Sequence, residues 1–245
     1  MTVALLGFDA DDTLWHNESV FRITEDRFAA LLADHAAPET IAARLLETER
    51  RNLRRYGYGI KGFTLSMIET AMEITDGDCP AEVTRAILGF GHEMLEHPVE
   101  CLPGVEAVLR ALAPAHRMVL ITKGDLFDQE RKLAQSGLGE LFDGVEIVSE
   151  KTAETYATLF ARHGAPVGAA AEAALMTGNS LRSDVLPALE AGAWAAHVPY
   201  EITWAHEAAE APRGHPRFAA LATLNDLPAL IRRIGDGEGL GGDGI

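Results

Sequence analysis

The stretch of residues 3–15 constrains the fold more than any other part of the chain. A short apolar run, residues 3–8, is followed at once by three carboxylates, Asp9, Asp11 and Asp12. The run is too short for a helix that ends in water, but it suits a strand buried on both faces. Open α/β sheets bind ligands at the carboxyl ends of such strands. The sequence therefore predicts a functional site directly after the first strand.

The spacing of these acids suggests what the site does. Residues two apart in an extended segment point the same way, so Asp9 and Asp11 are expected to project together, with Asp12 turned aside as a solvated turn acid. Two ionised carboxylates this close repel each other unless a cation or a shared proton compensates. We interpret the pair as a site for a divalent metal and a nucleophile.

Composition limits the class of protein. A length of 245 residues allows one large domain or a domain with a substantial insertion, and 47% apolar residues suffice for a full core. The net charge of −16 argues against nucleic acid or an anionic membrane as the partner. An acidic surface also repels a phosphorylated ligand at long range, so any phosphate site would need local positive charge.

Cysteine usage and the lack of targeting segments suggest the compartment. Cys79 and Cys101 form no CxxC pair, so a disulfide framework is not expected. The N-terminal apolar stretch has no basic leader, and no run approaches the ~20 apolar residues of a membrane helix. We therefore expect a cytoplasmic protein; the sequence does not indicate its oligomeric state.

Residues 16–98 have a helical pattern, with apolar residues at helical spacing and Pro38 in the first turn of the second helix. Between the second and third helices, residues 54–62 form an expected Gly-rich loop with three cations and two aromatics. This loop is either a mobile connector with solvated charges or a substrate-facing part of a lid.

Beyond residue 98 strands and helices alternate, which predicts a parallel sheet with right-handed crossovers. The fold class is α/β, a Rossmann-like three-layer core with an inserted all-helical cap. The expected domains are a split core of residues 1–15 and 99–245, a helical cap of 16–98, and a flexible Gly-rich tail of 235–245. The elements expected after residue 98 are strands at 117–121, 145–148, 173–176 and 193–198 and helices at 104–112, 125–136, 152–162 and 183–191.

Polar groups of complementary kinds follow the first strand and the strands at 117–121, 145–148 and 173–176. They resemble the motifs of the haloacid dehalogenase-like (HAD) hydrolase superfamily, phosphatase type. The pattern of that family is Asp-x-Asp-x-Thr, then a strand-terminal Thr or Ser, a Lys, and Gly-Asp with a second acid four or five residues later. The matching residues here are Asp9, Asp11, Thr13, Thr122, Lys151, Gly178, Asn179 and Asp184. A helical cap inserted after the first strand is also a family arrangement.

The resemblance implies a Mg²⁺-dependent phosphomonoesterase that acts on a small phosphorylated metabolite through an aspartyl-phosphate. Asp9 would attack phosphorus, and Asp11 would protonate the leaving oxygen and then deprotonate water. Thr122 would hydrogen-bond a phosphoryl oxygen, and Lys151 would offset negative charge. The implied metal ligands are Asp9, the main-chain carbonyl of Asp11, Asn179 and Asp184.

One residue departs from the family pattern, because Asn179 stands where the family usually has Asp. Its amide oxygen can still bind a hard cation but brings no negative charge. Thr13 is expected to brace the loop rather than react. Asp184 has an alternative role as a first-turn helix acid, and Trp15 and His16 are as well explained by hinge packing as by substrate contact. The candidate substrate residues are Trp15, Tyr58, Lys61 and Lys123.

Other functions remain open at this stage. A phosphomutase or another phosphotransferase of the superfamily uses the same groups, whereas a dehalogenase would not need Asp11. A receiver-like signalling module is shorter and keeps its phosphoacceptor on a later strand, and a catalytically silent phosphate-binding protein is the third alternative. The nine histidines show no HExxH spacing, which disfavours a zinc site.

Overall fold

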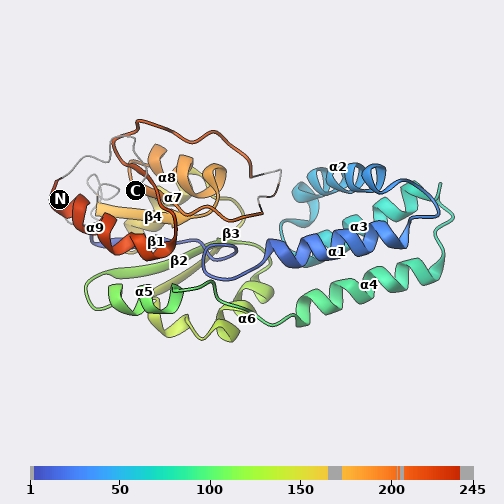
Figure 1. The fold of residues 1–245 in the computed structure, drawn as a ribbon, viewed down its shortest axis with the longest axis horizontal. Coiled ribbons are helices and arrows are strands. Elements are labelled where there is room, and N and C mark those ends of the chain that lie inside the picture. Colours follow the sequence, from blue (N-terminus) through green and yellow to red (C-terminus); the bar gives the residue numbers. More distant parts are fainter. Residues whose placement is uncertain (1–2, 165–172, 203, 205–206, 238–245) are drawn as a thin grey trace. The chain divides into compact units, whose positions relative to one another are not determined.

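A computed structural model describes residues 3–164, 173–202, 204 and 207–237. The chain divides into two compact units (Figure 1). The first unit comprises residues 1–16, 99–123 and 132–245, and the second comprises residues 17–98 and 124–131.

The first unit is built on a parallel sheet with the strand order β3-β2-β1-β4-β5-β6. Phe8, the last residue of β1, pairs with Leu120 of β2 and Thr177 of β4, so the end of β1 lies between these two strands. The strands are β1 (Leu5–Phe8), β2 (Arg117–Lys123), β3 (Gly144–Val148), β4 (Ala174–Gly178), β5 (Trp194–His197) and β6 (Phe218–Ala220).

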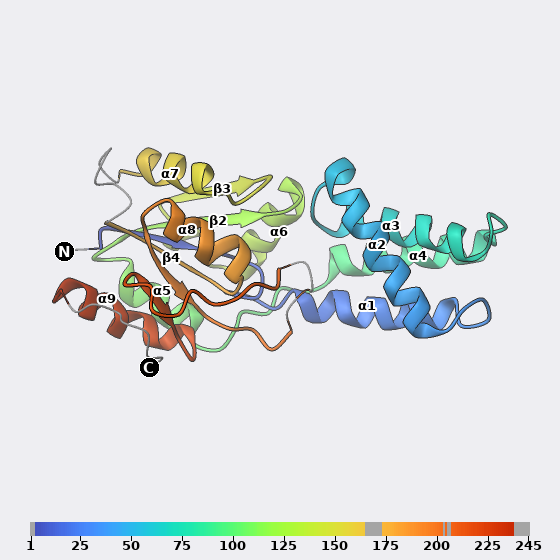
Figure 2. The ribbon, with the colours of Figure 1, turned by 90° about the horizontal axis from the view of Figure 1, so that it is seen from above.

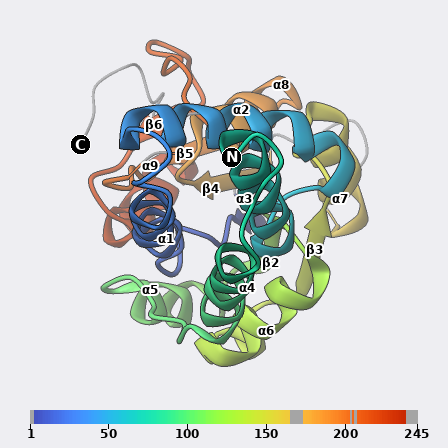
Figure 3. The same ribbon diagram turned by 90° about the vertical axis from the view of Figure 1, so that its right-hand side faces the viewer.

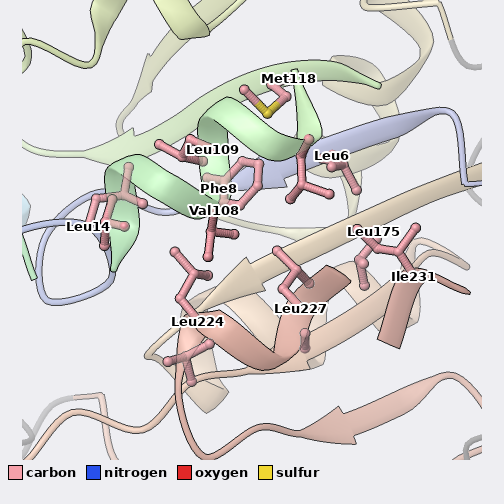
Figure 4. Packing of buried hydrophobic residues seen from close by; sticks show 14 of the residues in the cluster. Leu6, Phe8, Leu14, Val108, Leu109, Met118, Leu175, Leu224, Leu227 and Ile231 are labelled. Carbon is pink, nitrogen blue, oxygen red and sulfur yellow. The ribbon is translucent and has the colours of Figure 1, made fainter. Parts of the chain in front are cut away.

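Helices cover both faces of this sheet, which gives three layers (Figures 1 and 2). Phe8 of β1 packs on one face with α5 and α9, and Figure 4 shows this core. Leu5 of β1 packs on the other face with α7 and α8. The flanking helices are α5 (Val105–Leu112), α6 (Leu126–Ser136), α7 (Ala153–Arg162), α8 (Leu186–Glu190) and α9 (Leu227–Gly235). The predicted α/β fold class and the doubly buried first strand are confirmed.

The sequence analysis missed the last two elements of the sheet unit. Strand β6 has three residues and lies at the edge of the sheet, which is too short a segment for a pattern to appear. Helix α9 does have apolar residues at helical spacing, and its start is preceded by a capping box between Thr223 and Asp226. Helix α9 extends to Gly235, where the Gly-rich tail was expected to begin, and residues 238–245 of that expected tail lie outside the described residues.

The described residues of the second unit include the whole of α1 (Glu18–Leu31), α2 (Pro38–Tyr56), α3 (Ile60–Ile74) and α4 (Ala81–Glu96), and the start of α6. Phe28, Ile41, Met67 and Ile87 are fully buried in its own core, one from each of α1 to α4. In Figure 3 α1 and α4 are viewed nearly end-on and α2 is inclined to them. No helix in the described part of the chain has the length and apolar character that crossing a membrane requires.

The loop expected at residues 54–62 is much shorter than predicted. Helix α2 continues to Tyr56 and α3 begins at Ile60, so the connection is residues 57–59. Gly57 and Gly59 make the sharp turn with positive φ angles of 72° and 107°. The cations Arg54, Arg55 and Lys61 therefore lie on helices, because the two glycines suffice to reverse the chain.

Residues 124–131, the start of α6, belong with the helical unit although the sequence suggested the α/β unit. The Nζ atom of Lys61 donates to both carboxylate oxygens of Asp125 at 2.9 and 3.0 Å. A guanidinium nitrogen of Arg131 donates to the carbonyl of His97 at 3.3 Å. These contacts hold the segment against α3 and the end of α4.

The two connections to the helical segment are paired within the sheet unit. The amide of His16 donates to the carbonyl of Glu100 at 3.0 Å, and the amide of Leu102 donates to the carbonyl of Leu14 at 2.8 Å. Trp15 and Cys101 form an antiparallel bridge between these bonds. The chain therefore leaves and re-enters the sheet unit through neighbouring backbone segments.

Candidate active site

The end of β1 places Asp9 in the middle of the sheet edge. Its amide donates to the carbonyl of Thr177 in β4 at 2.9 Å, which fixes its backbone. The chain then turns, because the amides of Thr13 and Leu14 both donate to the carbonyl of Ala10. Asp12 takes a φ of 61° in this turn, a conformation that Asp tolerates better than most residues.

The expectation that Asp12 is solvated is wrong, because only 6% of this residue is exposed. It is a turn residue, as predicted, but the compact turn and the neighbouring core leave it little access to water.

The carboxylate of Asp9 lies in a buried cluster with Lys151 and Asp184. The Nζ atom of Lys151 donates to Oδ1 of Asp9, and it donates to Oδ1 of Asp184 at 2.6 Å. The three side chains are between 1% and 9% exposed. Two acids, one after β1 and one after β4, therefore share one buried ammonium group, with a net charge of −1 when all three are ionised.

Burial and the charge of Asp184 raise the pKa of Asp9 to about 7, although Lys151 opposes the shift. Burial lowers the pKa of Lys151, but the two carboxylates outweigh it and hold this pKa above its ordinary value. When Asp184 is ionised, the cluster therefore disfavours ionisation of Asp9 as well, unless more positive charge is brought in.

Gly178 allows Asp184 to reach this cluster. A Cβ atom on Gly178 would lie 2.3 Å from Oδ2 of Asp184, which no side chain can accommodate. The same oxygen accepts a hydrogen bond from the amide of Ser180 at 2.9 Å. The π-helical turn Leu181–Val185 that follows holds Asp184 in this position.

Thr13 was expected to brace its own loop, and in the structure it also joins the first and fourth strand ends. Its hydroxyl lies 3.1 Å from Oδ2 of Asp9 and 3.3 Å from Oδ1 of Asn179, and its one proton can serve either acceptor. The amide of Asn179 donates to the Thr13 oxygen at 3.0 Å. The side chain of Asn179 therefore lies in the same cluster as Asp9.

The expectation that Asp11 shares the surroundings of Asp9 needs correction. Lys132 on α6 donates to both oxygens of Asp11 at 2.7 and 2.8 Å, and the indole of Trp15 donates to Oδ1 at 2.7 Å. Strand alternation does not predict this direction because β1 ends at Phe8 and a turn follows. Asp11 remains near enough for its charge to raise the pKa of Asp9, although less than burial and Asp184 do.

The end of β2 supplies Thr122 and Lys123. Thr122 is buried, and its hydroxyl donates to the carbonyl of Lys123 at 3.3 Å. The ammonium of Lys123 donates to Ser183 at 2.8 Å and to Glu207 at 2.7 Å. Lys123 thus joins the end of β2 to the π-helical turn after β4.

Sequence reasoning missed Lys132, Tyr156 and Glu207. Buried Tyr156 donates to the carbonyl of Ser183 at 3.1 Å, and burial with the charge of Asp184 raises its pKa well above 10, so it stays neutral. Lys132 and Tyr156 face inward on predicted helices, so helix-face analysis could have found them. Glu207 does not come directly after a strand, and the sequence around it has no helical or strand periodicity. No sequence pattern therefore indicated it.

The remaining candidates for substrate contact are placed as follows. Trp15 is fully buried and supports Asp11, which favours the packing role. His16 contacts the hydroxyl of Tyr200 at 2.7 Å. Tyr58 and Lys61 belong to the helical unit, and their contact with substrate stays a prediction.

The candidate metal ligands are few, but their chemistry suits a magnesium ion. Among the described residues no three or more His, Cys, Asp and Glu side chains are grouped to hold a metal. Oxygens of Asp9, Asp184 and Asn179 nevertheless belong to one hydrogen-bonded cluster. Carboxylate and amide oxygens are hard ligands of the kind Mg²⁺ prefers, and the cluster's negative charge favours a cation.

Comparisons with known proteins agree with this arrangement. The sequence model for haloacid dehalogenase-like hydrolases matches residues 3–192. A haloacid dehalogenase-like family hydrolase from Xanthomonas campestris is 42% identical, with 96% of this chain and 93% of that one covered and a TM-score of 0.86. Among curated proteins, none matches the chain significantly.

Two more distant structures share the fold. The putative HAD-hydrolase YfnB from Bacillus subtilis, bound to magnesium, is 16% identical with a TM-score of 0.65, over 95% of this chain and 100% of that one. The 2-haloacid dehalogenase from Pseudomonas syringae is 20% identical with a TM-score of 0.61, over the same shares. The match over most of the sequence and the shared fold lead to one conclusion: the chain belongs to the haloacid dehalogenase-like hydrolase family.

Proposed function

We propose that this hydrolase is a Mg²⁺-dependent phosphomonoesterase that acts on a small phosphorylated metabolite through an aspartyl-phosphate on Asp9. The observation that carries the proposal is Asp11, a second carboxylate two residues after Asp9, positioned by Lys132 and Trp15. An alcohol leaves phosphorus readily only when its oxygen is protonated, whereas a halide leaves carbon without a proton. A carboxylate at this position therefore favours phosphate esters over haloacids.

In the first step Asp9 attacks phosphorus and forms an acyl-phosphate, and the phosphorus–oxygen bond to the alcohol breaks. Asp11 enters this step protonated and gives its proton to the leaving oxygen. Thr13 and Lys151 orient the Asp9 carboxylate through their hydrogen bonds. Thr122 donates to a phosphoryl oxygen, and the charge of Lys151 offsets negative charge on the transferred group.

In the second step Asp11, now a carboxylate, takes a proton from water, which attacks the phosphorus of the acyl-phosphate. The phosphorus–oxygen bond to Asp9 breaks, inorganic phosphate leaves, and the Asp9 carboxylate is restored. Splitting one difficult displacement into two gives each step a lower barrier, which a slow reaction such as phosphate ester hydrolysis requires.

The residues that would hold Mg²⁺ are the Asp9 carboxylate, the Asp11 carbonyl, Asn179 and Asp184. When bound, the ion supplies positive charge that reduces repulsion between Asp9 and the substrate and polarises the phosphoryl group. The charge of the cluster supports this role, because Lys151 alone leaves one carboxylate charge uncompensated when Asp9 and Asp184 are both ionised.

Changing Asn179 to Asp is expected to tighten Mg²⁺ binding about tenfold, because a carboxylate replaces a neutral oxygen beside the cation. Isothermal titration calorimetry at neutral pH measures the effect. The matched control is Asn225→Asp, which makes the same change at an exposed position, and it is expected to leave the affinity unaltered. Equal or weaker affinity in the Asn179 variant would count against this ligand.

The function itself is tested with p-nitrophenyl phosphate and a panel of metabolite phosphates, with Mg²⁺ or with excess chelator. We expect inorganic phosphate to be released only when Mg²⁺ is present. Transfer of the phosphoryl group to a second position of the substrate, without free phosphate, would indicate a phosphomutase. Chloride release from 2-chloropropionate without phosphatase activity would indicate a dehalogenase, and no turnover at all would favour a silent binding protein.

A further inference from the structure

We propose that Glu207 determines which phosphate esters this site accepts. Its carboxylate neutralises Lys123 beside Thr122, so the site favours esters of uncharged alcohols over esters that carry a second anionic group. The inference rests on the proposed phosphomonoesterase function and adds a substrate class to it.

Lys123 is the cation that a second anionic group would meet. It ends β2 directly after Thr122, the residue expected to bind a phosphoryl oxygen. Its Nζ atom donates to the hydroxyl of Ser183 at 2.8 Å, and Ser183 immediately precedes Asp184. The ammonium group therefore belongs to the residue that follows the proposed phosphate-binding threonine, and it contacts the residue that precedes a proposed metal ligand.

Glu207 reaches this ammonium from the segment between β5 and β6. Its Oε1 atom accepts a hydrogen bond from Lys123 at 2.7 Å. Its Oε2 atom accepts bonds from the hydroxyls of Ser180 and Ser183, each at 2.5 Å. The side chains of Lys123 and Glu207 are only 12% and 15% exposed. Both carboxylate oxygens are thus used within a largely buried cluster.

The cluster is continuous with the catalytic acids. Ser180 binds Glu207 through its hydroxyl and Asp184 through its amide, the latter at 2.9 Å. Asp184 in turn shares Lys151 with Asp9. Glu207 is therefore two hydrogen-bonded contacts away from Asp184, through Ser180.

The charge of Glu207 is retained at all pH values near neutrality. Burial alone would raise its pKa, but Lys123 and the two hydroxyls outweigh this effect and lower the pKa to about 2. A substrate carboxylate must then displace an ionised group of the same chain. The effective concentration of such an internal group is high, because its attachment already holds it near Lys123.

The test compares two phosphate esters of equal length, 2-phosphoglycolate and 2-hydroxyethyl phosphate, with the full-length enzyme and Mg²⁺. The wild type is expected to prefer 2-hydroxyethyl phosphate. In Glu207→Gln the ratio of kcat/KM for 2-phosphoglycolate to kcat/KM for the neutral ester is expected to rise about tenfold, mainly through KM. The control Glu210→Gln makes the same charge change at an exposed residue of the same segment and should leave the ratio unaltered.

The role of Lys123 is tested by the double variant Glu207→Gln/Lys123→Met, in which the gain for 2-phosphoglycolate is expected to disappear. Persistence of the gain would overturn the proposal, because the effect would then not run through this ammonium group. A wild-type preference for 2-phosphoglycolate would also overturn it.

Failure of this inference is distinguishable from failure of the proposed function. If the wild type hydrolyses neither ester nor any member of the metabolite panel, the phosphomonoesterase function is wrong. If it hydrolyses the neutral ester and the ratio in Glu207→Gln stays within about twofold, only the role of Glu207 is wrong. Should circular dichroism show Glu207→Gln unfolded, Glu207→Asp withdraws the carboxylate by one methylene and must raise the ratio in the same direction.

Discussion

Asp9→Asn is expected to lose phosphate release by a factor of about 10⁴ or more, because an amide cannot act as the nucleophile. The same variant is expected to fold with equal or greater stability. Burial and repulsion from Asp184 both oppose the charge of Asp9, and the amide removes that charge while it can still accept a hydrogen bond from Lys151. Single-turnover phosphate release and thermal unfolding measure the two effects.

Asp12→Asn is the matched control for this prediction, since Asp12 is also a buried acid of the same turn and Asn accepts its positive φ angle. It is expected to keep most of the turnover. Full activity in Asp9→Asn would mean that water attacks phosphorus directly. A large fall in melting temperature would instead show that the Asp9 charge stabilises the fold.

Lys151→Met is expected to lower the free energy of unfolding by about 3–5 kcal/mol, because it leaves two buried carboxylates without their shared cation. When both are ionised, neither Asp9 nor Asp184 can donate a proton to the other. In the native protein both accept hydrogen bonds from Lys151 instead. Added Mg²⁺ is expected to restore part of the stability, since the ion would bring positive charge to the same acids. Denaturant unfolding with and without Mg²⁺ measures both effects.

Two variants sharpen the interpretation. Lys61→Met is the matched control, because it removes a lysine from an exposed ion pair with Asp125. It is expected to lower the free energy of unfolding by at most about 1 kcal/mol. The double variant Lys151→Met/Asp9→Asn should be more stable than Lys151→Met alone, because one of the two uncompensated carboxylates is gone. If Lys151→Met were as stable as the wild type, the buried acids would have to be neutral in the folded protein.

The convergence of Asp9, Lys151 and Asp184 follows from information that the sequence contains. Buried apolar runs mark parallel strands, and the carboxyl ends of parallel strands meet at one edge, so polar residues at those ends come together. Thr13 is predictable for the same reason, since it lies in the first turn after a recognised strand. These local patterns also predict most helices and strands, apart from β6 and α9.

The rest depends on side-chain directions and long-range contacts that no local pattern contains. Asp11 turns to Lys132 because β1 ends before it, and the alternation rule then fails. Glu207 is brought to Lys123 by a segment without regular periodicity. The length of the connection between α2 and α3 was overestimated, because the glycines, arginines and tyrosines of residues 54–62 suit a loop. In the structure helix packing extends α2 and α3 through most of these residues and leaves only 57–59 as the connection.

The paired backbones at residues 14–16 and 100–102 make the helical segment an exchangeable module. Its two attachment points are already held together by the bonds from His16 and Leu102, so the entropy lost in closing this excursion depends only weakly on how many residues it contains. A relative's segment grafted between these points should leave the strand register of the sheet unchanged, provided that residues 124–131 are exchanged with it. The helical segment can then diverge in evolution while the buried cluster of Asp9, Lys151 and Asp184 stays constant.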